Sequence, residues 1–239
     1  MDLVSKPAAN GRAGRPRAVP DTAPDLAPRE QILLAAAALF TEQGFGGTST
    51  RAIAQASGIR QASLYYHFAG KDDILAELLD RSVRPSTEMA RRLERAAGDD
   101  PGAAAAALHA LAEADVTLLA AVPHNVGSLY LLPEVRDQRF DDFRAQRAAL
   151  QATYGRLGIQ AQALAEAEPE AGNPLPSAAL GALLIQVVEV VIPLRRAEEP
   201  VPDPTPAAIA DAVLRLVGLD AVQIRTARAR SAELVGIAP

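Results

Sequence analysis

The chain has 239 residues, of which 49% are hydrophobic and 22% charged, so it can bury a sizeable core and is longer than a single minimal module. It contains no cysteine, which excludes disulfides and thiolate metal sites, and its first residues lack the apolar segment of a secretory signal. The formal net charge of −5 differs from the positive balance expected of a nucleic-acid binder, but the distribution of charge matters more than its sum. We expect a cytoplasmic protein of two domains, or of one domain with an appendage.

Helices dominate the expected structure. Alanine is abundant, aromatic residues make up 4% of the chain, and the long segments between prolines lack the alternating β-branched runs that strands need. The sequence therefore predicts an all-α fold.

Residues 1–28 are expected to form a flexible basic arm. Five prolines and two glycines interrupt them, and four basic residues face one acid within residues 1–20. Within the arm, Gly14-Arg15-Pro16-Arg17 resembles the core of an AT-hook, whose extended arginines enter a narrow A·T-rich minor groove. A solvated tail is the alternative interpretation.

Three helices are predicted next. From Arg29, apolar residues recur at helical spacing, and Gly44 stands where a C-cap belongs. Thr48, Ser49 and Thr50 offer N-cap hydroxyls to a short helix that ends at Ser57-Gly58. A third helix is predicted over 61–68, with Leu64 and Phe68 on one face and a polar face left free.

Helices are also predicted for the rest of the chain. A longer helix opens at Lys71 and is expected to be interrupted by Pro85. Further helices are predicted at 86–97, 102–121, 127–132 and 134–157, the last closed by Gly158, and then at 177–195 and 205–217 after a loop at 159–176.

Two short helices joined by a tight glycine-containing turn, the second with a polar face, are what a helix-turn-helix requires. The segment from Thr48 to Lys71, TSTRAIAQASGIRQASLYYHFAGK, closely resembles the DNA-binding signature of the TetR family of regulators. The resemblance covers about residues 29–80. It implies a helix-turn-helix DNA-binding domain at 29–80, followed by a helical effector-binding and dimerisation domain at 81–220. With the arm at 1–28 and a C-terminal tail at 221–239, the chain is expected to have four parts.

The residues of this motif suit the roles that the resemblance implies. Gln61 can pair with adenine, Ser63 can serve several bases, and Ala62 lets the helix approach a thymine methyl. Arg60 stands where the family often has a small capping residue, so an extra base or phosphate contact becomes available there. Positions that in this family hold the phosphate backbone or the groove wall carry Ser49, Thr50, Arg51, Tyr65, Tyr66, His67 and Lys71.

The domain at 81–220 gives fewer signals. A mostly apolar pocket with sparse polar anchors is the usual form of a small-molecule site. The candidate effector-binding anchors are His109, Asp115, His124, Asn125 and Tyr130. Each has an ordinary alternative, since a single histidine on a helix is more often a satisfied interior or surface residue. We expect no cofactor and no metal, because three histidines without cysteine leave a closed transition-metal site short of ligands.

The helices at 177–195 and 205–217 carry more apolar surface than one subunit needs, which predicts a homodimer formed through them. The stretch from Leu175 to Leu194 is nearly long enough to span a membrane, but Gln186 and Glu189 near its middle and the prolines at its ends argue for a buried helix instead.

We therefore expect a repressor that binds a near-palindromic operator in double-stranded DNA as a homodimer and is released by a small-molecule effector. A DNA-binding regulator without a ligand switch is one alternative. An enzyme that uses the C-terminal pocket is another, although the sequence has no nucleophile elbow, phosphate-binding loop or metal-ligand spacing.

Overall fold

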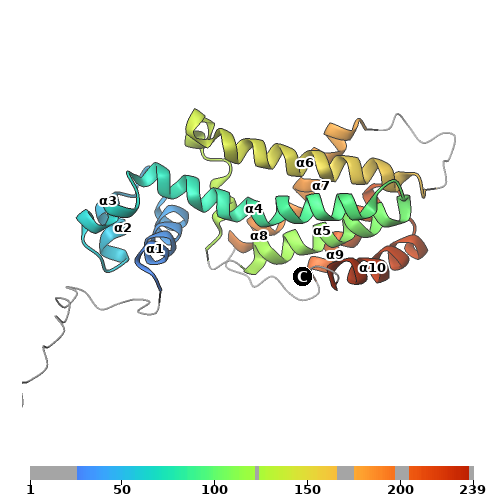
Figure 1. Ribbon diagram of the computed structural model, residues 1–239, viewed down its shortest axis with the longest axis horizontal. Helices are drawn as coiled ribbons and strands as arrows, with labels where there is room; N and C mark the ends of the chain where they lie inside the picture. Colours follow the sequence, from blue (N-terminus) through green and yellow to red (C-terminus); the bar gives the residue numbers. More distant parts are fainter. Residues whose placement is uncertain (1–25, 122–123, 166–174, 197–204, 237–239) are drawn as a thin grey trace, which may run out of the picture.

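The computed structural model describes residues 26–121, 124–165, 175–196 and 205–236. Throughout these ranges the regular structure is helical, which confirms the all-α prediction. The molecule is elongated, with three N-terminal helices at one end and a bundle of the remaining helices at the other (Figure 1). The predicted basic arm, including Arg15 and Arg17, lies outside the described residues except for its last three positions.

The N-terminal unit consists of α1 (Pro28–Gln43), α2 (Thr50–Ala56) and α3 (Gln61–His67). Gly44 ends α1 with φ of 79°, and Gly58 makes the turn between α2 and α3 with φ of 68°, a conformation that costs little only for glycine. Ser49 caps α2 by accepting a hydrogen bond from the Ala52 N–H at 3.1 Å. The three predicted helices are confirmed, and so are the glycines predicted to end the first two of them.

α4 (Lys71–Ala97) is one helix of 27 residues with Pro85 inside it, so the predicted interruption is wrong. Proline removes one backbone hydrogen bond from a helix. Here the turn around it is held by packing, because Val83, Ser86 and Thr87 are all buried. α4 also runs through residue 80, where the boundary between the two domains is predicted.

The segment after α5 (Pro101–Ala121) departs from the prediction. The helix expected at 127–132 is a short 3-10 turn, and the helix expected at 134–157 starts later and ends later. Gly158 does not end that helix, because it is buried where a Cβ would lie 2.9 Å from Leu180 Cδ2, so its role is close packing. The elements observed are η1 (Val126–Leu129), η2 (Pro133–Arg136), η3 (Gln138–Phe140) and α6 (Asp141–Gln162).

The last helices are α7 (Ser177–Glu189), α8 (Val191–Arg196), α9 (Thr205–Leu216) and α10 (Ala221–Gly236). The first three match the two predicted apolar helices, but the predicted tail at 221–239 is wrong, since most of it forms α10. The Asp220 carboxylate accepts from the backbone of Val222 and Gln223 at 2.7 and 2.8 Å, while the Gln223 side chain accepts from the Asp220 N–H at 2.8 Å. This reciprocal capping starts a helix that buries Ile224 and Ala227.

α5 forms the centre of the bundle, where α4, α6, α9 and α10 all contact it. Its first half is a run of alanines, 103–107, that are at most 2% exposed, and small side chains allow the neighbouring helices to approach closely. Two stretches, 101–121 and 177–195, are long and apolar enough to cross a membrane by composition. The first of them is this core helix.

α6 and α7 cross at very short range. A Cβ on Gly155 would overlap with the carbonyl oxygen of Ser177, and a Cβ on Gly181 would overlap with that of Gln151. The two glycines are buried, so neither neighbour can move away without displacing packed side chains.

Replacing Gly155 with alanine should therefore force α6 and α7 apart. We expect a loss of about 1 to 3 kcal/mol in the free energy of unfolding, measured by urea denaturation. Gly46→Ala is the matched control, since a Cβ at Gly46 meets no atom within 4 Å. Equal stability of the two variants would contradict the tight crossing.

Candidate DNA-binding surface and sensor cavity

The turn between α2 and α3 is held from inside the N-terminal unit. Ile53 and Leu64 are fully buried between the three helices, and the Ile59 N–H donates to the Ala54 carbonyl at 3.0 Å across the turn. Because this local packing fixes the angle between the two helices, the outer face of α3 is presented as a rigid surface.

The outer face of α3 carries the residues predicted to read bases. Gln61, Ala62 and Ser63 are exposed in its first turn, directly after Arg60, which is exposed and stands at the N-cap without making a side-chain cap. The exposed fraction of Tyr66 is 87%, a large value for an aromatic side chain with no partner surface.

A short chain of hydrogen bonds links α2 to α3 on this surface. The Thr50 hydroxyl lies 3.1 Å from the Tyr65 hydroxyl and accepts from Gln61 Nε2 at 3.4 Å. The neighbouring Ser49 is engaged in capping α2, Arg51 is exposed, and His67 is half-buried with its ring edge-on to Tyr66. The predicted residues from Ser49 to His67 thus lie on the exposed side of α2 and α3.

Lys71 has internal partners. Its ammonium donates to the carbonyls of Phe45 and Thr48 at 2.8 and 3.0 Å and lies 4.4 Å from the centre of the Phe45 ring. These contacts fasten the loop before α2 to the start of α4. The predicted phosphate contact of Lys71 stays a prediction, and the geometry gives this residue a structural role.

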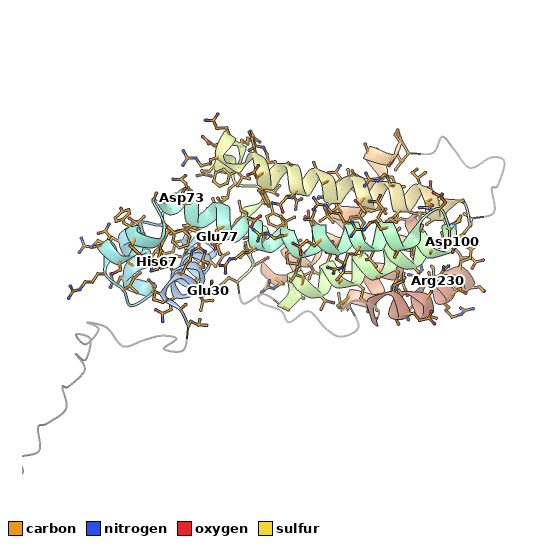
Figure 2. All side chains as sticks on the ribbon, viewed as in Figure 1. Glu30, His67, Asp73, Glu77, Asp100 and Arg230 are labelled. Carbon is orange, nitrogen blue, oxygen red and sulfur yellow. The ribbon has the colours of Figure 1, made fainter. Side chains whose placement is uncertain are left out.

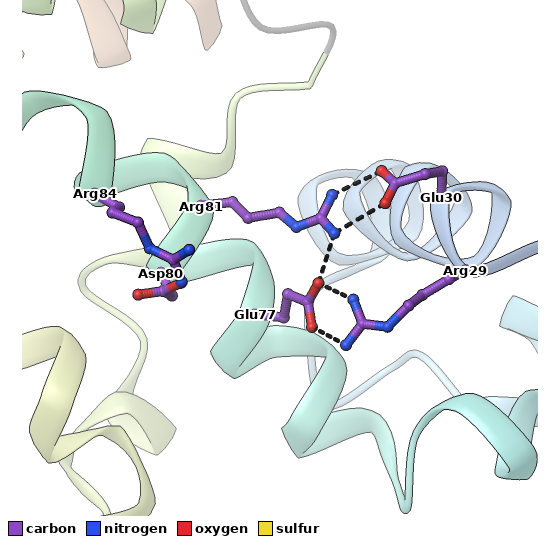
Figure 3. A network of polar contacts seen from close by, with 6 residues as sticks. All are labelled: Arg29, Glu30, Glu77, Asp80, Arg81 and Arg84. Carbon is purple, nitrogen blue, oxygen red and sulfur yellow. Dashed lines mark hydrogen bonds and ion pairs between the residues drawn. The ribbon is translucent and has the colours of Figure 1, made fainter. Parts of the chain in front are cut away.

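An ion-pair network joins α1 to α4 (Figure 3). Glu77 pairs with Arg29 and with Arg81, and Arg81 also holds Glu30 at 2.7 Å. Burial alone would raise the pKa of Glu77, but the hydrogen bond from Arg29 and the two positive charges lower it overall. Figure 2 places Glu30 and Glu77 at the junction with the N-terminal unit, whereas the Asp100–Arg230 pair lies at the opposite end of the bundle.

A small polar cavity lies inside the bundle between α4, α5, α6 and α7. We call it the chamber; its volume is about 20 Å³, and its polar lining consists of Ser82, Ser86, Asp115, Tyr130, Arg147 and Glu189. Tyr154 donates to the Asp115 carboxylate at 2.7 Å, and Ser86 also hydrogen-bonds it. Burial and the nearby Glu189 charge outweigh these bonds and raise the pKa of Asp115 to about 6.

A second cavity of about 570 Å³ adjoins the chamber and shares Tyr130, Arg147 and Glu189 with it. We call it the vestibule; it is lined by Gly127, Ser128, Leu131, Leu132, Pro133, Gln186, Val190, Ile192 and Pro193 in addition to the shared residues. Arg147 donates to Glu189 at 2.5 and 3.2 Å and stacks 4.5 Å from the centre of the Tyr130 ring. The shared residues therefore separate the two cavities.

The structure brings together two of the five predicted effector anchors, Asp115 and Tyr130. His109 lies elsewhere, fully buried between α5, α9 and α10, with its ring nitrogens 3.2 Å from Asp211 and from Ser231. Asn125 donates to the Ile192 carbonyl at 2.8 Å and so ties the segment before η1 to α8. His124 is half-buried, and burial lowers its pKa.

Comparison with known proteins supports this architecture. Residues 32–78 match the family described as bacterial regulatory proteins, tetR family. The crystal structure of Mycobacterium smegmatis AmtR is 41% identical in sequence, with a TM-score of 0.79, and the match covers 92% of this chain and 100% of that one. The chain belongs to the TetR family.

Other TetR-family relatives match shorter parts of the chain in sequence. The transcriptional repressor KstR2 of Mycobacterium tuberculosis is 47% identical over 51 residues, which is 21% of this chain and 26% of KstR2. This chain thus matches about a quarter of the length of that curated relative. The solved structure of the same regulator has 22% identity and a TM-score of 0.63 over 80% of this chain and 93% of that one, a likeness in fold.

The sequence interpretation missed four polar residues that line the chamber, Ser82, Ser86, Arg147 and Glu189. It also missed Tyr154, which donates to Asp115. A signal existed for Glu189, because a carboxylate within a strongly apolar helix needs a partner inside the protein. No comparable signal marked Arg147, since α6 carries other arginines on its surface.

The raised pKa of Asp115 predicts a pH-dependent contribution to stability. In the unfolded chain this carboxyl ionises near 3.8, but in the fold it ionises near 6, so its contribution is greatest below about pH 4 and is lost as the pH rises to 6. An Asp115→Asn variant, whose amide can still accept from Tyr154, should be more stable than the unaltered chain by about 1 to 3 kcal/mol at pH 7.5.

Urea unfolding at pH 4.5 and pH 7.5 measures this difference. We expect the advantage of Asp115→Asn to shrink at the lower pH, because the carboxyl of Asp115 is then protonated in the folded protein. A constant difference across the two pH values would contradict the burial of a charged carboxylate at Asp115.

Proposed function

We propose that the chain is a cytoplasmic transcriptional repressor that binds a near-palindromic operator as a homodimer and is released by a small-molecule effector. The observation that carries the proposal is the rigid, exposed first turn of α3, which displays Gln61, Ala62 and Ser63 within a TetR-family fold. A helix with such a face fits the major groove.

The roles within the surface follow from their chemistry. Gln61 and Ser63 are proposed to read base edges, while Arg51, Arg60 and Tyr66 are exposed donors suited to phosphates. The hydrogen bond that the Gln61 amide donates to Thr50 limits the positions of that amide before DNA arrives, which lowers the entropy cost of pairing with a base.

The combined change Gln61→Ala and Ser63→Ala should abolish preference for the operator. Fluorescence anisotropy with DNA from the protein's own promoter region, at several salt concentrations, measures the effect. We expect a loss of about 1 to 3 kcal/mol per base contact with an unchanged salt slope, whereas Arg51→Ala should weaken all DNA binding and reduce that slope by about one. Unaltered operator preference in the double variant would refute base reading by α3.

Dimerisation is proposed to use the outer faces of α7, α8 and α9. Along α7 and α8 the exposed apolar residues follow one helical stripe, and α9 adds a second stripe beside it. A symmetry mate packed on these stripes would form a four-helix interface and place two copies of α3 about 34 to 36 Å apart. The stripes consist of Ala179, Leu183, Val190 and Leu194 on α7 and α8, and of Ala208, Ala212 and Leu216 on α9.

A charge in the middle of the α7 stripe should separate the subunits. For Leu183→Glu, analytical ultracentrifugation is expected to show a monomer with operator affinity reduced by about two orders of magnitude or more, because one half-site alone is weak. Val222→Glu on α10 is the control, since Val222 is also exposed but lies outside both stripes. A dimeric Leu183→Glu variant would place the interface elsewhere.

The effector site is proposed to be the chamber together with the vestibule. Tyr130 and Asp115, both lining the chamber, hydrogen-bond to Ser82 and Ser86 of α4, so a ligand that rearranges them acts on the helix that carries the DNA-binding unit. A regulator without a ligand switch is the alternative. It is favoured by the small volume of the chamber, and a screen for ligand-induced thermal stabilisation would distinguish the two.

A further inference from the structure

The chamber contains more negative than positive charge. Asp115 is 4% exposed, and among the described residues it receives hydrogen bonds from two hydroxyls, those of Tyr154 and Ser86. Arg147 pairs with Glu189, so the lining holds two carboxylates and one guanidinium. A buried carboxylate with no cation beside it is unfavourable unless a positive group joins it.

Arg147 and Glu189 differ in how easily each side chain can leave the ion pair and move into solvent. The Arg147 side chain is 22% exposed and lies on a long stem at the vestibule, so its guanidinium can turn outward and stay hydrated. Glu189 is 14% exposed and lies between Arg147, Gln186 and the buried Asp115. An anionic ligand that took Arg147 would leave two carboxylates together without a cation, whereas a cationic ligand that replaced Arg147 would neutralise them.

We propose that the chamber and vestibule recognise a hydrophobic cation, an ammonium group carried on an apolar body. This inference rests on the proposed function, because it names the chemical class of the effector of that same site. The ammonium group replaces the Arg147 guanidinium beside Glu189 and over the Tyr130 ring, which attracts cations through its face, in a cavity that the Asp115 carboxylate also lines. Three ammonium hydrogens suit an arrangement of carboxylate acceptors.

The vestibule suits the apolar part of such a ligand. Half of its lining residues are aliphatic or proline, and Leu131 is 91% exposed at its edge, an unusual position for a leucine. Its volume of about 570 Å³ lies within the range of small-molecule pockets. Occupation of both cavities therefore combines burial of apolar surface with neutralisation of the carboxylates.

Three probes with one apolar body and different head groups test the charge preference: 4-phenylbutylamine, 4-phenylbutanol and 4-phenylbutyrate. Isothermal titration calorimetry and thermal shift of the full chain at pH 7.5 measure their binding. We expect the amine to bind at least about tenfold more tightly than the alcohol or the carboxylate. Preference for either of the other two, or no binding of the amine, would overturn the proposal.

Variants of the pair give a sharper test. Glu189→Gln and Asp115→Asn should each weaken amine binding by about tenfold or more, whereas Arg147→Gln should strengthen it, because the competing internal cation is gone. Asp142→Asn on α6 removes an exposed carboxylate outside both cavities and should leave the amine affinity unchanged. Circular dichroism confirms folding of each variant. Loss of amine binding in a folded Arg147→Gln variant would show that Arg147 does not compete with the amine and would overturn the proposal.

Operator binding, measured separately by anisotropy, distinguishes this inference from the proposed function. Specific operator binding without any response to the amine overturns the cation site and leaves the DNA-binding role intact. Amine binding with the expected pattern among the variants supports the cation site even where operator affinity does not change, and in that case the release mechanism of the proposed function fails instead.

Discussion

The guanidinium–carboxylate pairs between α1 and α4 fix the DNA-binding helices onto one end of a helix whose other end is packed inside the bundle. Arg29 and Arg81 hold Glu77 and Glu30 across this junction, and Lys71 closes it from the loop side. A single ion pair adds little to the free energy of unfolding where it is exposed to solvent. In a network, however, one carboxylate that pairs with two guanidinium groups orders several side chains at once. Any displacement of α4 is therefore transmitted to α1, α2 and α3 as one unit.

How much could be predicted from the sequence depended on how local the controlling contacts are. The helix-turn-helix was predicted with its caps and turns, because Ser49, Gly44 and Gly58 act on their immediate neighbours. The capping box at Asp220 and Gln223 was equally local, and reading it would have identified α10. The interruption predicted at Pro85 was wrong because the packing that keeps α4 intact comes from other helices of the bundle.

The proposed effector cavity was harder to predict from the sequence for the same reason. Asp115 and Tyr130 were identified as polar groups in apolar surroundings, but the pairing of Arg147 with Glu189 joins residues 42 positions apart. His109, Asn125 and His124 have the same polar character, yet tertiary packing gives the first two structural bonds, to α9 and α10 and to α8. Polarity alone could not separate a residue that lines a cavity from one that fastens two helices.

The alanine run of α5 also limits how the protein can diversify. Residues 103–107 are buried in a helix that contacts α4, α6, α9 and α10, so larger side chains there would disrupt the bundle. The part of α5 that lines the chamber is its second half, at Asp115 and Leu119, and the other lining residues come from α4, α6, α7 and Tyr130 after η1. Evolution of a new ligand preference would therefore be concentrated in these few positions, while the first half of α5 would keep its small residues whatever compound the descendant senses.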